Sequence, residues 1–152
     1  MRSARGARGD GERFFETRLR VRFPEVDSYL VVWHGHYVGW FEIGRNALAD
    51  AFGAGTRALH EAGYLLPVIS VKIDYRHPAE LDDDVTIRTR LREPRGALFV
   101  CDYEAVRTRD GVLLAQGESR QVVLNRDRDL LVTLPKLLKE VAARIREFHL
   151  GG

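Results

Sequence analysis

Residues 14–23 alternate between apolar and charged side chains, and a long apolar segment follows them. Leu19, Val21 and Phe23 alternate with arginines, which is the period of two expected of a strand that buries one face. Residues 35–53 then carry apolar side chains around most of a helical circumference and leave only a narrow polar stripe. A helix with this pattern is expected to be surrounded by protein rather than to lie on a surface.

Four further segments predict β-strands, and in one of them, residues 85–92, apolar positions roughly alternate with polar ones. They are residues 65–76, 85–92, 97–108 and 112–124. The dipeptide Asp110-Gly111 between the last two is a strong hairpin signal. A short helix is predicted over residues 57–62, and a longer helix with one apolar face over residues 135–148. One long buried helix followed by strands in hairpins predicts an α+β fold, in which a curved antiparallel sheet wraps around the helix.

Length and composition favour one soluble domain, which we place at residues 14–149 of the 152. Residues 1–13 predict a disordered tail rather than a secretory signal, since no apolar segment follows their arginines. No apolar run approaches the ~20 residues that span a bilayer, so we expect no membrane insertion. A net charge of only +2 argues against a nucleic-acid partner. The single Cys101 excludes an internal disulfide, which favours the cytoplasm and a buried structural thiol.

Asp27 is the first candidate for chemistry, because it comes a few residues before the predicted buried helix. Unpaired N–H groups and the positive end of the helix dipole gather at such a position. A carboxylate beside them could take part in an attack on a polarised carbonyl. Aspartate also favours turns and helix caps, and on spacing alone that structural role is the more common one. No cluster of Cys and His has the spacing of a metal site.

The residues around Asp27 resemble the hotdog-fold acyl-CoA thioesterases of the 4-hydroxybenzoyl-CoA thioesterase family. The matching motifs are Phe23-x-x-x-Asp27, Val31-Val32-Trp33-His34, Tyr37-x-x-Trp40-Phe41-Glu42-x-x-Arg45, Leu66-Pro67-Val68, Tyr75-Arg76-His77-Pro78-Ala79 and Asp82-Asp83. The resemblance covers about residues 14–135. It implies the hotdog fold, a curved antiparallel β-sheet around a long central helix. It also implies hydrolysis of an acyl-CoA or acyl-carrier-protein thioester to free acid and thiol, with no cofactor except the coenzyme A of the substrate.

The same resemblance implies roles for particular residues. Asp27 would be the base or the nucleophile, and a backbone N–H near His34 or Gly35 would stabilise the oxyanion. The His34 side chain would orient water or pass a proton to the leaving thiolate, or else would simply bond to backbone at the start of the helix. The residues implied in substrate binding are Tyr29, Trp33, Tyr37, Pro67, Arg76 and Arg95. The aromatic ones would line the acyl pocket or the core, and the arginines would meet the nucleotide.

Leu30 departs from the family pattern, in which most members have glycine three residues after the aspartate. Leucine does not comfortably adopt positive φ, so we expect a different loop path or a conformation open to any residue. Glu42 and Arg45 are spaced for an ion pair on the polar stripe of the helix. His60 and His149 are predicted at exposed helix positions.

Three further expectations concern partners and alternative functions. By analogy with hotdog proteins we expect a homodimer or homotetramer. A hotdog hydratase or dehydratase is a weaker alternative, because six residues separate Asp27 from His34 and no Asn-Pro lies between them. A non-catalytic acyl-CoA-binding module is the other alternative, against which Asp27 argues and which Leu30 leaves open.

Overall fold

The computed structural model describes residues 11–152, and these form an α+β fold. Its elements are β1 (Phe15–Arg20), a 3₁₀ turn (Phe23–Glu25), α1 (His36–Ala51), α2 (Thr56–Ala62), β2 (Val68–Tyr75), β3 (Asp84–Leu91), β4 (Phe99–Arg107), β5 (Leu113–Gln121) and α3 (Lys136–His149). Every predicted strand and helix is present, with ends within three residues of the prediction. The sheet is antiparallel throughout, in the order β1-β3-β4-β5-β2.

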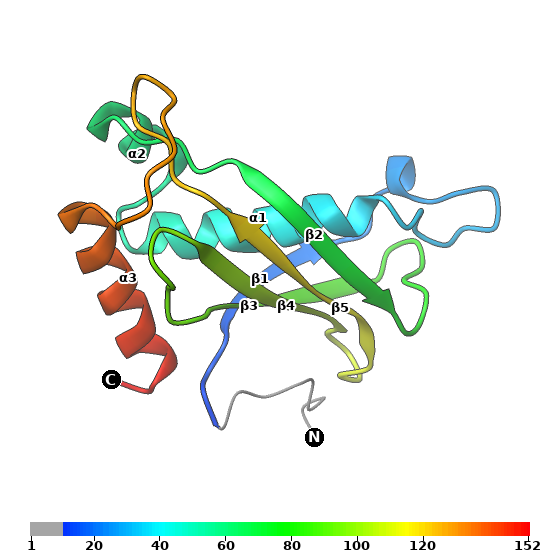
Figure 1. Ribbon diagram of the computed structural model, residues 1–152. Coiled ribbons are helices and arrows are strands. Elements are labelled where there is room, and N and C mark those ends of the chain that lie inside the picture. Colours follow the sequence, from blue (N-terminus) through cyan, green and yellow to red (C-terminus); the bar gives the residue numbers. More distant parts are fainter. Residues whose placement is uncertain (1–10) are drawn as a thin grey trace.

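Helix α1 crosses one face of the curved sheet, and α2 and α3 lie near the C-terminal end of α1 (Figure 1). The segment that leads into α1 extends beyond the opposite end. This arrangement confirms the expected sheet wrapped around a central helix. The site residues before α1 and the two shorter helices therefore lie at opposite ends of the molecule.

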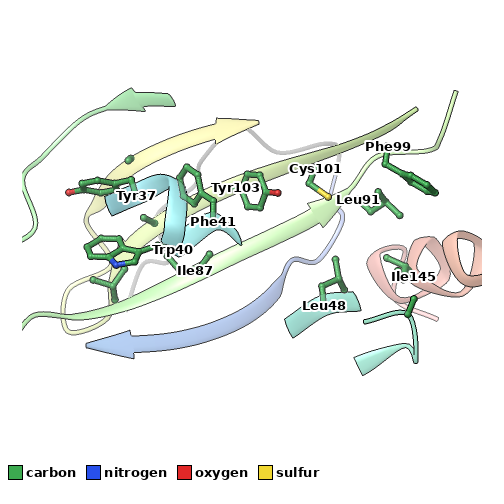
Figure 2. Close-up of a cluster of buried hydrophobic side chains, with 14 of the residues drawn as sticks. Tyr37, Trp40, Phe41, Leu48, Ile87, Leu91, Phe99, Cys101, Tyr103 and Ile145 are labelled. Carbon is green, nitrogen blue, oxygen red and sulfur yellow. The ribbon is translucent and has the colours of Figure 1, made fainter. Parts of the chain in front are cut away.

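The close approach of α1 to the sheet depends on Gly44. A Cβ atom at this position would lie 2.6 Å from both the Ile87 Cγ2 and the Thr89 Oγ1 atoms of β3. One turn before Gly44, the Phe41 ring stacks on Tyr103 with centroids 4.7 Å apart (Figure 2). Glycine is therefore needed for α1 to lie this close to the sheet.

One prediction about α1 is wrong for the single chain. Val38 and Ile43 remain 42% and 48% exposed, so protein does not surround the helix on all sides. The apolar positions of α1 exceed what one sheet face can cover, because a helix presents only part of its circumference to a sheet. The buried residues are Tyr37, Trp40, Phe41, Gly44 and Leu48.

Arginines on the face of the sheet away from α1 pair with carboxylates of neighbouring strands. Arg92 contacts Asp102 at 2.6 Å and Glu118 at 2.7 Å, and Arg90 contacts Asp102 at 2.7 Å. Burial opposes the charge of Asp102, but its two arginine partners outweigh this effect and hold its pKa below the usual value. These arginines therefore stabilise the sheet through ion pairs and are not available to bind phosphate groups.

Residues 1–10 of the predicted tail lie outside the described residues. Residues 11–13 are described, and they contact the domain. Glu12 forms ion pairs with Arg146 at 2.5 Å and Arg90 at 3.5 Å, and the Arg13 guanidinium donates to the Phe148 carbonyl at 2.7 Å. The packed chain therefore begins before residue 14.

His149 is fully buried, so its prediction as an exposed helix residue is wrong. The Leu91 N–H donates to its Nε2 at 3.0 Å, and its Nδ1 donates to the Arg13 carbonyl oxygen at 2.8 Å. The periodicity of α3 does not reveal this, because the residues that cover His149 come from β3 and from the segment before β1. His60, by contrast, is exposed as predicted.

Cys101 is buried as expected, and burial raises the pKa of its thiol to about 11. Within residues 11–152 no group of three or more His, Cys, Asp or Glu residues could hold a metal ion. None of the helices in this range is both long enough and apolar enough to cross a membrane.

Candidate active site

Asp27 lies on a short two-stranded ribbon between β1 and α1. Val26 and Val32 pair in antiparallel fashion, and the Trp33 N–H donates to the Glu25 carbonyl at 3.0 Å. The Asp27 N–H donates to the Val31 carbonyl at 2.9 Å, at the turn of the ribbon. Asp27 is thus about 7 Å beyond the Glu25–Trp33 pair along the strand.

The turn at Asp27 has two further hydrogen bonds and one strained residue. The Asp27 carbonyl accepts the Leu30 N–H at 2.9 Å, and its Oδ1 accepts the Tyr29 N–H at 2.8 Å. Leu30 has φ 61°, so leucine adopts the left-handed conformation after all. The expectation that the loop would avoid positive φ is therefore wrong. A type I turn followed by a left-handed residue closes such a ribbon, and the residue takes this conformation at an energetic cost.

The start of α1 presents two consecutive N–H groups. Gly35 is the N-cap residue of the helix. The Trp33 and His36 N–H groups are bonded to the carbonyls of Glu25 and Trp33, both at 3.0 Å. Among the described residues, the N–H groups of His34 and Gly35 have no acceptor. The Trp33 indole lies against Gly35 so closely that any Cβ there would collide with it.

Tyr75, at the end of β2, anchors this part of the chain. Its hydroxyl donates to the His34 carbonyl at 2.6 Å, and its ring packs edge-on against the rings of Tyr37 and His34. Tyr37 in turn accepts the Ala79 N–H at 3.2 Å. Burial raises the pKa of both tyrosines, so their hydroxyl groups stay protonated at neutral pH. Sequence reasoning did not assign Tyr75, because its contact with His34 spans 41 residues of chain.

Glu25 is a buried acid next to the site that the sequence did not reveal. It is 6% exposed, and its carboxylate accepts the Trp40 indole N–H and the Arg22 backbone N–H, both at 2.8 Å. Burial raises its pKa, but these hydrogen bonds and the Arg22 charge outweigh burial and leave the pKa below the ordinary value. Glu25 therefore joins the ribbon to α1 as a bonded carboxylate.

The structure brings some of the predicted residues together and separates others. Trp33, His34, Gly35 and Tyr37 meet at the start of α1, and Arg76 follows Tyr75 directly. Asp27 shares the ribbon, but within the described chain no hydrogen bond or ion pair links its carboxylate to His34. Tyr29 is 85% exposed at the tip of the turn. The predicted ion pair of Glu42 and Arg45 is present at 3.7 Å.

Pro67 and Arg95 lie at the other end of the sheet. The register aligns Tyr75 with Ala115 and Ala105, whereas Val68 aligns with Gln121 and Phe99. The seven residue-to-residue steps from Val68 to Tyr75 span roughly 23 Å. Pro67 precedes Val68, and Arg95 is exposed in the turn before β4. Within one chain these two residues therefore cannot share a site with Asp27.

A cavity of about 350 Å³ opens at this second end, and we call it the distal cavity. Its apolar wall includes Leu48, Leu59, Leu66, Phe99, Leu138 and Ile145. Figure 2 shows Leu48, Phe99 and Ile145 at the opposite side of the buried cluster from Tyr37 and Trp40. Its exposed lining residues include Glu42, Asn46, Pro67 and Val68, so it opens between α1 and the start of β2.

Known proteins are similar to this chain in both sequence and fold. The putative acyl-CoA thioesterase YneP of Bacillus subtilis is 29% identical over 56% of this chain, a match that spans only 62% of YneP. The acyl-CoA thioester hydrolase YbgC of Escherichia coli O6:H1 is 27% identical over 88% of this chain and 96% of its own. A hypothetical protein from Thermus thermophilus superposes with a TM-score of 0.79 at 27% identity, over 86% of this chain and 98% of that one.

The curved sheet around the central helix is the hotdog fold. The family model and the sequence relatives identify the class of protein as a thioester hydrolase. The chain belongs to the thioesterase-like superfamily, whose model matches residues 21–145. The match includes the ribbon, α1, the whole of the sheet except β1, and most of α3. The resemblance recognised in the sequence is thereby confirmed.

Proposed function

We propose that this protein hydrolyses an acyl-CoA, or the corresponding acyl-carrier-protein thioester, to a free acid and a thiol. The observation that carries the proposal is the pair of N–H groups at His34 and Gly35, which have no acceptor among the described residues. Two such donors at the start of a helix suit the negative oxygen of a tetrahedral intermediate. Each donor of this kind contributes roughly 10²–10³-fold to the rate.

Asp27 supplies the second part of the reaction. One of its carboxylate oxygens is held by the Tyr29 N–H, which leaves the other available as nucleophile or as base for a water molecule. Attack on the carbonyl carbon forms the tetrahedral intermediate, and its collapse breaks the C–S bond. Attack by water gives the free acid directly, whereas attack by Asp27 gives a mixed anhydride that a water molecule then hydrolyses to the free acid. The thiolate then takes a proton from water or from His34, whose ring packs against Trp33 and Tyr75. The reaction requires no cofactor beyond the coenzyme A of the substrate.

The protein acts as a homodimer that forms through β2, and two dimers form a tetramer by the family analogy. The proposal is supported by the sheet order, in which β2 pairs with β5 only and its other edge is open. Val68, Ile69, Val71 and Tyr75 of this strand are 41–59% exposed. A long apolar edge strand is a template for pairing with a second copy. The single buried thiol supports a cytoplasmic location.

A non-catalytic acyl-CoA-binding module is the second candidate. It is supported by the hydrogen bond from the Tyr29 N–H to the Asp27 carboxylate, which a purely structural aspartate would also accept. The two candidates differ in whether a thiol is released. They share the fold and the binding of an acyl-CoA.

The test is thiol release from a panel of acyl-CoAs by the wild type and by Asp27→Asn. Asparagine retains an oxygen that can accept the Tyr29 N–H, so the fold should persist while hydrolysis falls by ~10²-fold or more. Asp127→Asn, in an exposed turn, is the matched control and should retain full activity. Tight binding of acyl-CoA without any release would favour the binding module. Full activity of Asp27→Asn would remove Asp27 from the mechanism.

A further inference from the structure

The buried carboxylate of Glu25 links the strand that carries Asp27 to the first turns of α1. Its Oε2 atom accepts the Trp40 indole N–H and its Oε1 atom accepts the Arg22 backbone N–H, both at 2.8 Å. The side chains of Glu25 and Trp40 are both buried. Among the described residues, no other hydrogen bond joins residues 22–27 to α1. The position of this strand against the helix therefore depends on Glu25.

The second strand of the ribbon is held in place independently of Glu25. The Val32 N–H donates to the Ala79 carbonyl at 2.9 Å, which ties this strand to the segment between β2 and β3. The same strand leads directly to the His34–Gly35 donors. The strand of Asp27 lies at the outer edge of the ribbon, where this bond does not reach it. The placement of Asp27 relative to the donors therefore needs a contact of its own.

Glu25 is not itself available as a base or nucleophile, because both of its oxygens accept hydrogen bonds. In Asp27, by contrast, only Oδ1 accepts a hydrogen bond within the described chain, from the Tyr29 N–H. Burial raises the pKa of Glu25, but its N–H donors and the Arg22 charge outweigh burial and hold the pKa below the usual value. The acceptor in the link is therefore charged at neutral pH, and such hydrogen bonds are roughly twice as strong as neutral ones.

The link lies close to both parts of the proposed reaction centre. Two residues of extended chain, about 7 Å, separate Glu25 from Asp27. Five residues of helix, about 7.5 Å along the axis, separate Trp40 from Gly35. The Glu25 carbonyl also accepts the N–H of Trp33, the residue before the first donor, at 3.0 Å. A shift of Glu25 against α1 would therefore move the acid relative to the donors.

We propose that Glu25 is a positioning residue, which holds Asp27 in place through its bond to Trp40. The inference rests on the proposed function, in which the Asp27 carboxylate and the His34–Gly35 donors meet at one thioester carbonyl. A displacement of about 1 Å in such an arrangement can lower the rate by roughly 10²-fold. Without the link, the strand of Asp27 would shift while the donors stay on α1. The loss should therefore fall on kcat rather than on substrate binding.

Glu25→Gln and Trp40→Phe test the link from its two sides. The glutamine amide nitrogen cannot accept a hydrogen bond, so one of the two N–H donors loses its partner, whereas phenylalanine keeps a ring but lacks the indole N–H. Each variant should lower kcat for thiol release by ~10- to 100-fold and change KM by less than about threefold. The double variant should lose no more than the weaker of the two single variants, because both changes break the same bond.

Tyr103→Phe is the matched control for the loss of a buried hydrogen bond. It removes the 2.6 Å contact of the Tyr103 hydroxyl with Ser119 and keeps the ring that stacks on Phe41 of α1. It should therefore lower stability to a similar extent and retain the wild-type kcat. Circular dichroism at the assay temperature checks that each variant is folded, and if one of the two link variants is unfolded, the other decides. A loss of kcat in Tyr103→Phe equal to theirs would overturn the positioning role.

A second measurement asks whether Glu25 acts through Asp27. In single-turnover thiol release with enzyme in excess, Glu25→Gln added to Asp27→Asn should cause less than about twofold further loss, because no carboxylate remains to be positioned. Equal losses in both backgrounds would overturn the proposal, and so would a wild-type kcat in Glu25→Gln or Trp40→Phe. These results leave the hydrolase intact. Absence of thiol release by the wild type from every acyl-CoA would instead refute the proposed function, and this inference with it.

Discussion

The hydroxyl of Tyr75 donates a 2.6 Å hydrogen bond to the carbonyl oxygen of His34 and so joins the end of β2 to the start of α1. This carbonyl belongs to the peptide unit whose nitrogen is that of Gly35. The bond therefore sets the direction of one of the two proposed oxyanion donors. Because β2 is also the open edge of the sheet, the same residue connects the proposed dimer contact with the proposed reaction centre.

Tyr75→Phe should lower kcat by roughly two- to tenfold, with little change in KM. The estimate follows from the net value of one hydrogen bond, about 0.5–1.5 kcal/mol, and from its positioning of a donor needed mainly in the transition state. Steady-state thiol release measures both constants. Thr86→Val is the control, since it removes a 2.9 Å hydroxyl bond to Thr108 away from the site and should retain kcat. A raised KM with unchanged kcat would contradict a positioning role.

Leu30→Gly should stabilise the protein by about 0.5–1 kcal/mol. Glycine relieves the left-handed strain of leucine at φ 61°, and part of that gain is offset by the greater freedom of glycine in the unfolded chain. Leu30 is 54% exposed, so little packing is lost. Urea unfolding measures the change. Leu130→Gly, at a similarly exposed leucine without positive φ, should destabilise instead. Equal effects of the two substitutions would disprove the strain.

His149 should make the folded protein less stable as the pH falls below about 6.5. Burial lowers its folded pKa from 6.5, so the unfolded chain binds the proton first. Its Nδ1–H donates to Arg13 O and its Nε2 accepts the Leu91 N–H, which suits only the neutral ring. Charged neighbours are Arg146 and Arg90, which lower the pKa further, and Glu12, which opposes them.

The free energy of unfolding measured between pH 5 and 8 checks this prediction. The contribution of His149 to stability should be complete at pH values above its unfolded pKa. Below that pH, the free energy of unfolding should fall by no more than about 1.4 kcal/mol per pH unit. His149→Gln should reduce this slope, whereas His60→Gln at an exposed position of α2 should leave it unchanged. An identical slope in both variants would assign the pH dependence to other groups.

Much of the fold could be predicted from local pattern. Alternation along β1 and the Asp110-Gly111 hairpin predicted strands correctly. In a half-buried strand successive side chains point to opposite faces, so apolar and polar residues alternate in the sequence. The exposure of Val38 and Ile43 could not be predicted in this way. An apolar helix looks the same in sequence whether its own sheet or a second subunit covers it.

The sequence by itself determined the elements, the family and the position of Asp27 before the central helix, because these depend on residues close together in the chain. Only the tertiary structure decided that Tyr75 holds His34, that His149 is buried and that the distal cavity lies far from Asp27. These relationships join segments separated by dozens of residues. They arise from strand order and helix packing, which the local spacing of side chains does not encode.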